Sequence, residues 1–238
     1  MTTLFEKHTF DRGAATLPYR LLRPDGYDRD GAGRYPLVVI LHGIGERGTD
    51  NERPLRNGVE EFARGPFRKA FPCFLVVPQC PPDQLWCNFS SAGTRGNLPL
   101  AHEPTEPAAL VLELIDAMRR EYRVDPGRIY LTGVSMGGYG TWDLIAREPS
   151  LFAAAIPVCG GGDPAQAGKL TRLPIWAFHG DQDELVPVER SRDMIAAIRQ
   201  AGGEPRYTEY AGVGHDSWTP TYRNVEVLAW LFGQQLGK

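Results

Sequence analysis

A serine with glycines on both sides stands where a β-strand pattern gives way to a helical one. Residues 133–137 read GVSMG and match the G-x-S-x-G motif. An apolar, β-branched run over 128–133 precedes the serine, and a helical pattern over 136–148 follows it. In a strand–turn–helix setting, a strained turn holds such a serine hydroxyl out above the sheet. The motif therefore predicts that Ser135 is a nucleophile.

A glycine-rich bend with an incidental serine is the alternative interpretation. It accounts for Gly133 but poorly for Gly137, Gly138 and Gly140, because a glycine inside a helix costs about 0.5–1 kcal/mol relative to alanine. Close packing of strand and helix around a nucleophile turn would explain these glycines, since the backbones would leave no room for a Cβ. We therefore expect tight backbone packing at this turn.

A serine hydroxyl is a weak nucleophile until a base accepts its proton, and the usual base is a histidine oriented by a carboxylate. His215 lies in a glycine-flanked segment directly after the last expected strand, where it can reach a site above the sheet. Surface, loop or packing roles account for the other four histidines: His8, His42, His102 and His179. His215 is therefore the expected general base.

The carboxylate that orients this histidine is expected after the strand at 174–180. Asp181 and Asp183 both stand in the segment that follows this strand. Position alone does not separate them. Either choice gives the chain order serine, aspartate, histidine, which differs from the orders of the chymotrypsin and subtilisin types.

The oxyanion of an ester intermediate needs preorganised donors, which two backbone N–H groups usually supply. Met136 follows the serine at the start of a helix, where the helix dipole also favours negative charge. Ile44 lies in the glycine-rich turn after the strand at 35–43. We expect these two amides to form the oxyanion hole. This chemistry requires no metal and no cofactor.

Strand and helix patterns alternate along the chain, which indicates a mostly parallel sheet of about eight strands with helices on both faces. Two solvent-facing strands, expected to be antiparallel, come first at 4–10 and 17–23. The other strands are expected at 35–43, 73–79, 128–133, 152–160, 174–180 and 206–212. The helices are expected at 59–71, 106–124, 136–148, 187–202 and 222–236. One domain over residues 1–238 is the prediction.

Composition and charge argue against several classes of protein. The net charge of −3 and the scattered lysines and arginines disfavour a nucleic-acid partner. No apolar run is long enough for a membrane span, and the first 20 residues lack a secretory pattern. A cytoplasmic location is expected, and secretion is open if a signal peptide has been removed. The four cysteines do not form a zinc pattern, and Cys80 and Cys87 could pair in an oxidising compartment.

Five segments of the chain together resemble the α/β-hydrolase superfamily: LHGIGERGTDN, PQCPPDQLWCN, GVSMGGYGTWDLI, HGDQDELVPV and GHDSW. More narrowly, they resemble bacterial phospholipase/carboxylesterase-like serine esterases, which are related to polyhydroxybutyrate depolymerases and feruloyl esterases. The resemblance implies the α/β-hydrolase fold and a metal-free esterase with Ser135 as nucleophile and His215 as base. It favours Asp183 over Asp181, because the aspartate of this superfamily commonly begins a D-x-x-V-P segment.

The same resemblance supports Ile44 and Met136 as oxyanion donors. Many relatives insert a helical cap where this chain has only the short segment 160–173, so no cap domain and an open, shallow site are expected. The irregular region 79–105, with Trp86 and Phe89, is a candidate pocket wall. Three aromatic residues are the expected substrate-binding residues: Trp86, Trp218 and Tyr139.

These expectations indicate a serine carboxylesterase for small short-chain or aryl-acyl esters, with an acyl-enzyme intermediate on Ser135. A feruloyl or acetyl-xylan esterase of plant polysaccharide breakdown is an alternative. A serine peptidase is another, although amide leaving groups are harder to displace. In a different class, the chain would be a catalytically silent binding protein on a hydrolase scaffold. The oligomeric state is open.

Overall fold

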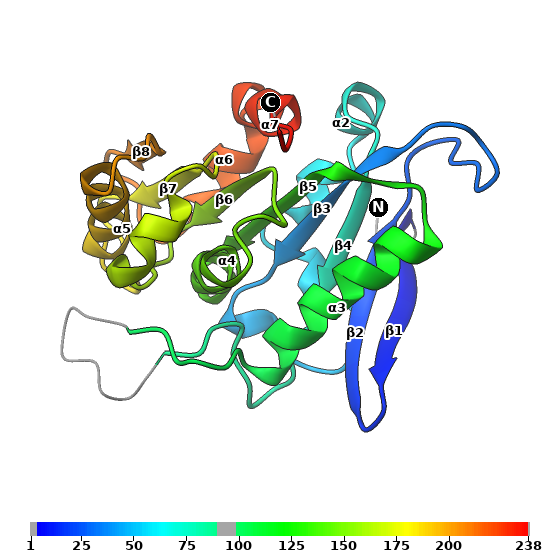
Figure 1. Cartoon of the computed structure of the whole chain (residues 1–238), viewed down its shortest axis with the longest axis horizontal. Coiled ribbons are helices and arrows are strands. Elements are labelled where there is room, and N and C mark those ends of the chain that lie inside the picture. The colour runs from blue at the N-terminus through cyan, green and yellow to red at the C-terminus, as the bar shows by residue number, and fades with distance from the viewer. Residues whose placement is uncertain (1–3, 90–98, 238) are drawn as a thin grey trace.

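The computed structural model describes residues 4–89 and 99–237, and its centre is one eight-stranded sheet (Figure 1). The strand order is β1-β2-β4-β3-β5-β6-β7-β8. β1 (Glu6–Arg12) pairs antiparallel with β2 (Ala15–Leu22), and β2 pairs antiparallel with β4 (Phe74–Pro78). All later pairs are parallel and involve β3 (Tyr35–Leu41), β5 (Val124–Val134), β6 (Ala154–Val158), β7 (Trp176–Gly180) and β8 (Arg206–Tyr210). The expected α/β-hydrolase architecture is confirmed.

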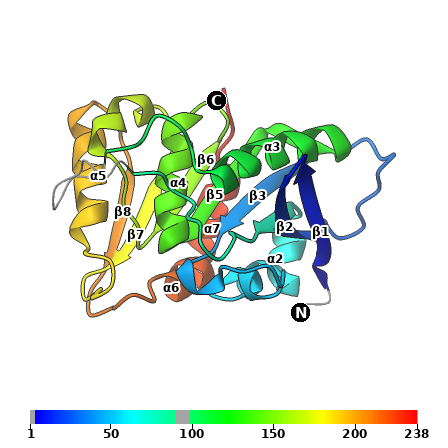
Figure 2. The same ribbon diagram turned by 90° about the horizontal axis from the view of Figure 1, so that it is seen from below.

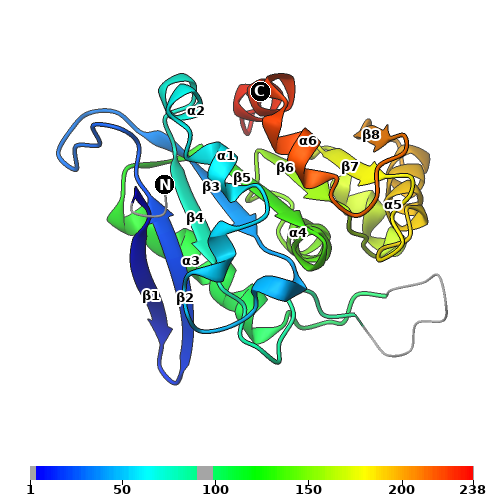
Figure 3. The ribbon, with the colours of Figure 1, turned by 180° about the vertical axis from the view of Figure 1, so that it is seen from behind.

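Helices cover both faces of this sheet. One face carries α3 (Glu106–Glu121), α4 (Met136–Arg147) and α5 (Glu189–Gln200). The other carries α1 (Val59–Phe62), α2 (Gly65–Ala70), α6 (Trp218–Arg223) and α7 (Val225–Gly233). Figure 2 shows α3 and α4 on one side of the sheet and α2 and α6 on the other, and Figure 3 shows α1 beside α6.

The central strands are buried on both faces, as their unbroken apolar runs predicted. In β3, Leu37, Val39 and Leu41 belong to the core under α3 and α4. Val38 and Ile40, which alternate with them, belong to the core under α1 and α7. A strand in this position has no solvent face that would require polar residues. Its sequence is therefore apolar rather than alternating.

Two expected helices are each divided in the structure. The helix predicted at 59–71 is split into α1 and α2, because Pro66 cannot donate the backbone hydrogen bond that would continue α1. The helix predicted at 222–236 is interrupted at Asn224, whose backbone is extended and whose side chain accepts from the N–H of Glu226 at 2.9 Å. Asparagine at this position caps the start of α7 instead of extending α6.

The segment 160–173 forms only one short 3-10 helix, Pro164–Leu170, which packs against α4 and α5. It does not reach over the site described below. All four cysteines are buried free thiols, so Cys80 and Cys87 are not bonded to each other. Within residues 4–89 and 99–237, no helix combines the length and apolar character needed to cross a membrane.

Candidate active site

Ser135 occupies a strained turn between the end of β5 and the start of α4. Its φ of 56° and ψ of −118° lie in a region that residues with a side chain rarely adopt. Two hydrogen bonds hold this conformation: the Ser135 N–H donates to Val158 O at 3.0 Å, and the Tyr139 N–H donates to Ser135 O at 3.0 Å. The turn places the serine at the carboxyl edge of the sheet, where ligands of parallel sheets bind.

Tight packing around this turn explains the glycines of α4. A Cβ on Gly137 would lie 2.0 Å from the carbonyl oxygen of Leu41 in β3. A Cβ on Gly140 would lie 2.4 Å from the Cβ of Trp86. Any larger residue would push the helix away from the sheet and move the serine with it. The expected close packing is confirmed.

His215 lies between Ser135 and Asp183. Its Nε2 is 3.0 Å from Ser135 Oγ, and its Nδ1 is 2.7 Å from Asp183 Oδ2. A carboxylate accepts but does not donate, so the proton of the neutral ring belongs on Nδ1. Nε2 is then free to accept the serine proton. The structure therefore brings together the three side chains that the sequence nominated.

The Asp183 side chain is fully buried, and three N–H groups contact its carboxylate at 2.9 Å or less: those of Leu185, Val186 and the His215 ring. Oδ1 accepts from the backbone N–H groups of Leu185 and Val186, each at 2.9 Å. Burial alone would raise the pKa of this carboxyl, but the hydrogen bonds from Val186, His215 and Leu185 outweigh burial and lower it. The carboxylate is therefore ionised at neutral pH, as the orientation of His215 requires.

Asp181 lies in the same loop but has a different partner. Its Oδ1 accepts from the N–H of Gly212, at 2.7 Å, in the turn after β8. The carboxylate that contacts His215 thus belongs to Asp183. The difference arises because the backbone turn at Leu185 and Val186 wraps around Asp183, whereas Asp181 faces the neighbouring turn.

The amides of Ile44 and Met136 flank the serine. A Cβ built on Gly43 would lie 3.7 Å from the Cβ of Ser135, which places the next residue, Ile44, beside the nucleophile. Among the described residues, neither the Ile44 N–H nor the Met136 N–H donates to a protein acceptor. Both residues line the same groove as Ser135. Two unpaired amides at the starts of helical turns are suited to bind an oxyanion.

His42 fixes the peptide that carries the Ile44 amide. Its ring is buried, and its Nε2 accepts from the N–H of Cys80 at 2.9 Å. Nδ1 therefore carries the proton and donates to Gly43 O at 2.6 Å. This carbonyl and the Ile44 N–H belong to one planar peptide unit, so holding one end orients the other.

This burial makes a prediction for acid stability. Burial lowers the pKa of His42 to about 4, from its ordinary 6.5. Below pH 6.5 the unfolded chain binds a proton at His42 that the folded protein excludes, so the free energy of unfolding falls until about pH 4. At ~1.4 kcal/mol per pKa unit, His42 alone accounts for a fall of about 3 kcal/mol.

Urea unfolding between pH 7.5 and 4 measures this effect. His42→Gln should lose about 3 kcal/mol less than the wild type over this range, because glutamine does not titrate. His102→Gln, at an exposed histidine, should follow the wild-type curve. If the free energy of unfolding fell equally with pH in the wild type and in His42→Gln, His42 would not be the cause of the acid destabilisation.

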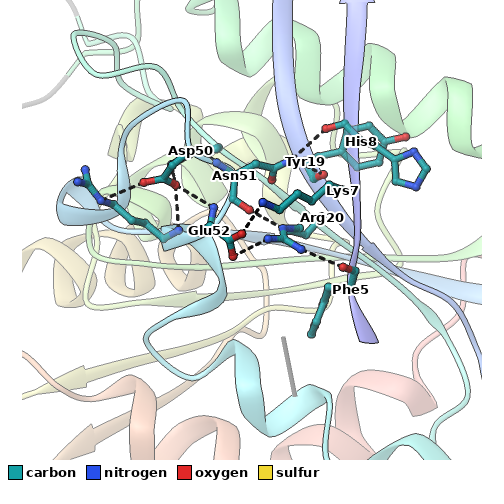
Figure 4. A network of polar contacts seen from close by, with 10 residues as sticks. Phe5, Lys7, His8, Tyr19, Arg20, Asp50, Asn51 and Glu52 are labelled. Carbon is teal, nitrogen blue, oxygen red and sulfur yellow. Dashed lines mark hydrogen bonds and ion pairs between the residues drawn. The ribbon is translucent and has the colours of Figure 1, made fainter. Parts of the chain in front are cut away.

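A polar network anchors the rest of the loop that carries Ile44 (Figure 4). Gln79 Oε1 accepts from the Asn51 N–H at 2.6 Å, and Gln79 Nε2 donates to Glu46 O and Asp50 Oδ1 at 3.0 Å. The buried Arg20 of β2 donates to Asn51 O and pairs with Glu52. The loop is thus tied to the antiparallel edge of the sheet.

Sequence reasoning did not identify this network. One signal was available: Gln79 directly follows the apolar run of β4, and a fully buried amide needs polar partners. The identity of those partners could not be read from the sequence. Asn51 and Arg20 are distant from Gln79 along the chain.

A groove of about 500 Å³ lies over Ser135 and His215. Its walls are mainly apolar, and Tyr139 is one of the residues that line it, with its ring edge-on to that of Phe89 at 5.8 Å between centroids. Ile44 and Leu185 at its rim are 55% and 75% exposed. The other lining residues are Leu85, Cys87, Met136, Val186 and Arg190. The site is open, as the short 160–173 segment indicated.

Two predicted wall residues lie elsewhere. Trp86 is fully buried: its indole N–H donates to His42 O at 3.1 Å, and its Cβ packs against Gly140. It supports the loop that carries Ile44 from beneath and does not line the groove. Trp218 packs edge-on against the His215 ring, at 5.4 Å between centroids, and is also absent from the groove lining. Residues 90–98 of the loop predicted as a wall lie outside the described residues.

One group of ligand-type atoms overlaps this site. The donor atoms of Cys159, Asp183 and His215 lie within 4.8 Å of one another. Burial raises the pKa of the Cys159 thiol to about 12, so a thiolate ligand is costly at neutral pH. Asp183 and His215 already hydrogen-bond to each other. The group is better suited to proton transfer than to metal binding.

Comparison with known proteins agrees with this geometry. The model of the dienelactone hydrolase family matches residues 101–226. A thermostable esterase of known structure superposes with a TM-score of 0.88 and 42% identity, over 98% of this chain and 64% of that one. Poly(3-hydroxyalkanoate) depolymerase C of Paucimonas lemoignei is 37% identical over 44% of this chain and 31% of its own. A bifunctional acetylxylan esterase/xylanase of Neocallimastix patriciarum is 36% identical over 40% of this chain and 14% of its own.

The chain therefore spans less than two thirds of the length of these relatives. The family match covers more than half of the chain and includes the segments that carry Ser135, Asp183 and His215. The chain belongs to the dienelactone hydrolase family, within the α/β-hydrolase superfamily.

Proposed function

We propose that this chain is a serine carboxylesterase that hydrolyses small esters with short-chain or aryl acyl groups. The observation that carries the proposal is the hydrogen-bonded series Ser135, His215 and Asp183 beneath an open apolar groove. Membership of a hydrolase family and the likeness to a thermostable esterase support it.

In the first step, Ser135 Oγ attacks the ester carbonyl carbon while His215 Nε2 accepts the hydroxyl proton. The carbonyl oxygen becomes an oxyanion, which the N–H groups of Ile44 and Met136 stabilise. Collapse of this intermediate breaks the bond to the alcohol, which leaves with the proton from His215. The acyl group remains on Ser135. Water then attacks the acyl carbon while His215 Nε2 accepts its proton. The bond to Ser135 Oγ breaks, His215 returns the proton to the serine, and the carboxylic acid is released.

The groove supports the limit on acyl size. A buried methylene contributes about 0.8 kcal/mol, but only where the protein removes it from water. The rim residues Ile44, Leu85 and Leu185 are exposed, and the described residues form no cap over them. Once an acyl chain extends beyond the groove, each further methylene stays in water and adds little to the binding free energy. An aryl group can instead pack against Phe89 and Tyr139.

A series of nitrophenyl esters tests this proposal. From acetate to butyrate kcat/KM should rise, and from butyrate to octanoate it should change by less than about threefold, because the added methylenes stay in water. A fluorophosphonate probe should label Ser135, identified by peptide mass spectrometry. Absence of both labelling and hydrolysis would favour the silent binding protein, and cleavage of peptide amides at comparable rates would favour a peptidase.

A feruloyl or acetyl-xylan esterase is the second candidate. The edge-on pair of Phe89 and Tyr139 in the groove favours an aromatic acyl group. The similarity to an acetylxylan esterase/xylanase favours the acetyl alternative. Release of ferulate from methyl ferulate, compared with release of acetate from acetylated xylan, separates the two. If kcat/KM for methyl ferulate and for acetylated xylan were both well below that for nitrophenyl butyrate, the result would favour the general carboxylesterase.

A further inference from the structure

A second histidine contacts Asp183 on the side away from the groove. His179 lies near the end of β7, and its side chain is completely buried. Its Nε2 is 3.2 Å from Asp183 Oδ2 and 3.0 Å from Val186 O. The same Oδ2 is 2.7 Å from Nδ1 of His215. One carboxylate oxygen therefore lies between two imidazole rings.

The partners of His179 determine where its proton lies. Asp183 Oδ2 and Val186 O are both acceptors, so Nε2 must be the protonated nitrogen. Nδ1 is 2.8 Å from Ser191 Oγ on α5. Burial lowers the pKa of His179, so the ring is neutral and Nδ1 is an acceptor. The Ser191 hydroxyl beside it also lies 3.0 Å from Gly160 O, so Nδ1 and that carbonyl share its one hydrogen. The ring thus has one donor, and Val186 O at 3.0 Å and Asp183 Oδ2 at 3.2 Å share it.

We propose that His179 is a positioning residue for the triad carboxylate, supplying a second N–H donor to the oxygen of Asp183 that orients His215. The inference rests on the proposed function, in which Asp183 is that carboxylate. Oδ1 is held by two backbone amides, and Oδ2 by two imidazoles. Without His179, a buried anion loses a donor, and the carboxylate can rotate away from His215.

The charged surroundings of His179 allow a pH measurement to report on this contact. Asp183 and His215 face it from the loops, and Glu209 lies opposite it on β8. Glu209 is bonded to Arg192 on α5 at 2.6 and 2.8 Å, and these bonds lower its pKa. Glu209 therefore stays ionised across the pH range of the activity profile.

Three variants test the inference. His179→Leu removes the donor and should lower kcat roughly 10- to 100-fold, as expected for one hydrogen bond to a charged group, with KM changed less than about threefold. His179→Gln places an amide N–H near the position of Nε2 and should recover most of the activity. Ser191→Ala removes the hydroxyl beside Nδ1, together with its bond to Gly160 O, but leaves the Nε2–H donor in place, so its kcat should stay within about threefold of wild type.

The pH profile separates positioning from general structural damage. In His179→Leu the carboxylate can rotate away from His215, so the protonated His215 ring loses its anionic partner and the acidic limb of kcat/KM should move to lower pH. In His179→Gln it should stay near the wild-type position. The inference would be overturned if a folded His179→Leu variant kept the wild-type kcat and the wild-type acidic limb of kcat/KM. Equal losses of kcat in His179→Leu and His179→Gln would overturn it as well.

A readout without substrate keeps this result distinct from the proposed function. The Nδ1–H proton of His215, hydrogen-bonded to Asp183 Oδ2 at 2.7 Å, is expected to give a downfield resonance in ¹H NMR, which should shift in His179→Leu and return to its wild-type position in His179→Gln. If it shifts while the wild type hydrolyses no ester, the proposed function fails and the positioning contact stands. If Ser135→Ala abolishes hydrolysis but the resonance does not move in His179→Leu, the positioning role fails and the esterase assignment stands.

Discussion

Ser135→Ala is expected to lower kcat/KM for nitrophenyl butyrate by roughly 10⁴-fold or more. The variant lacks the oxygen that forms the acyl-enzyme, and His215 Nε2 loses its partner at 3.0 Å. The amides of Ile44 and Met136, which we propose as the oxyanion donors, remain, so a small residual rate through direct attack of water is expected. Purified protein assayed under single-turnover conditions measures both the loss and the missing acyl-enzyme.

The fold should not account for this loss. Alanine meets the same backbone constraint as serine at a φ of 56°, and the two hydrogen bonds that hold the turn are made by the backbone. The free energy of unfolding should therefore change by less than about 1 kcal/mol. Ser150→Ala, at an exposed serine beyond α4, is the matched control and should keep full activity. Retention of more than about 1% of the rate in Ser135→Ala would exclude an acyl-enzyme on this serine.

Most of the fold could be predicted because the signals that define it are local. Strand β3 is apolar throughout, since alternate residues enter two different cores, and that pattern needs no knowledge of the partners. The breaks before α2 and α7 also have local causes, in Pro66 and Asn224. They were missed because helical periodicity continues across both positions. Periodicity records which face is apolar and is insensitive to one residue that caps or interrupts a helix.

The site could be predicted only in part, because several of its contacts join distant segments. The nucleophile turn has a short motif, and the order of Ser135 and His215 along the chain is informative. Trp86 was misassigned because an aromatic residue in a loop looks the same in sequence whether it faces a groove or packs beneath a glycine. The role of His42 depends on the Cys80 amide, whose position requires the assembled sheet.

Asp183→Asn is expected to lower kcat by roughly 10³- to 10⁴-fold. The N–H groups of Leu185 and Val186 both point at Oδ1, so the asparagine oxygen must face them. The amide NH₂ then takes the place of Oδ2 and points at His215 Nδ1. A donor in that position forces His215 to accept at Nδ1 and to carry its proton on Nε2, and a protonated Nε2 cannot take the proton of Ser135.

Asp181→Asn makes the same chemical change two residues away and is the matched control. Asp181 Oδ1 accepts one backbone N–H, from Gly212, and an amide oxygen can replace it. Its kcat should remain within about threefold of wild type. Comparison of the two variants by steady-state kinetics, with unfolding curves for each, tests the geometry directly. A larger loss in Asp181→Asn would reverse the assignment, because the tautomer of His215 would then depend on the other carboxylate.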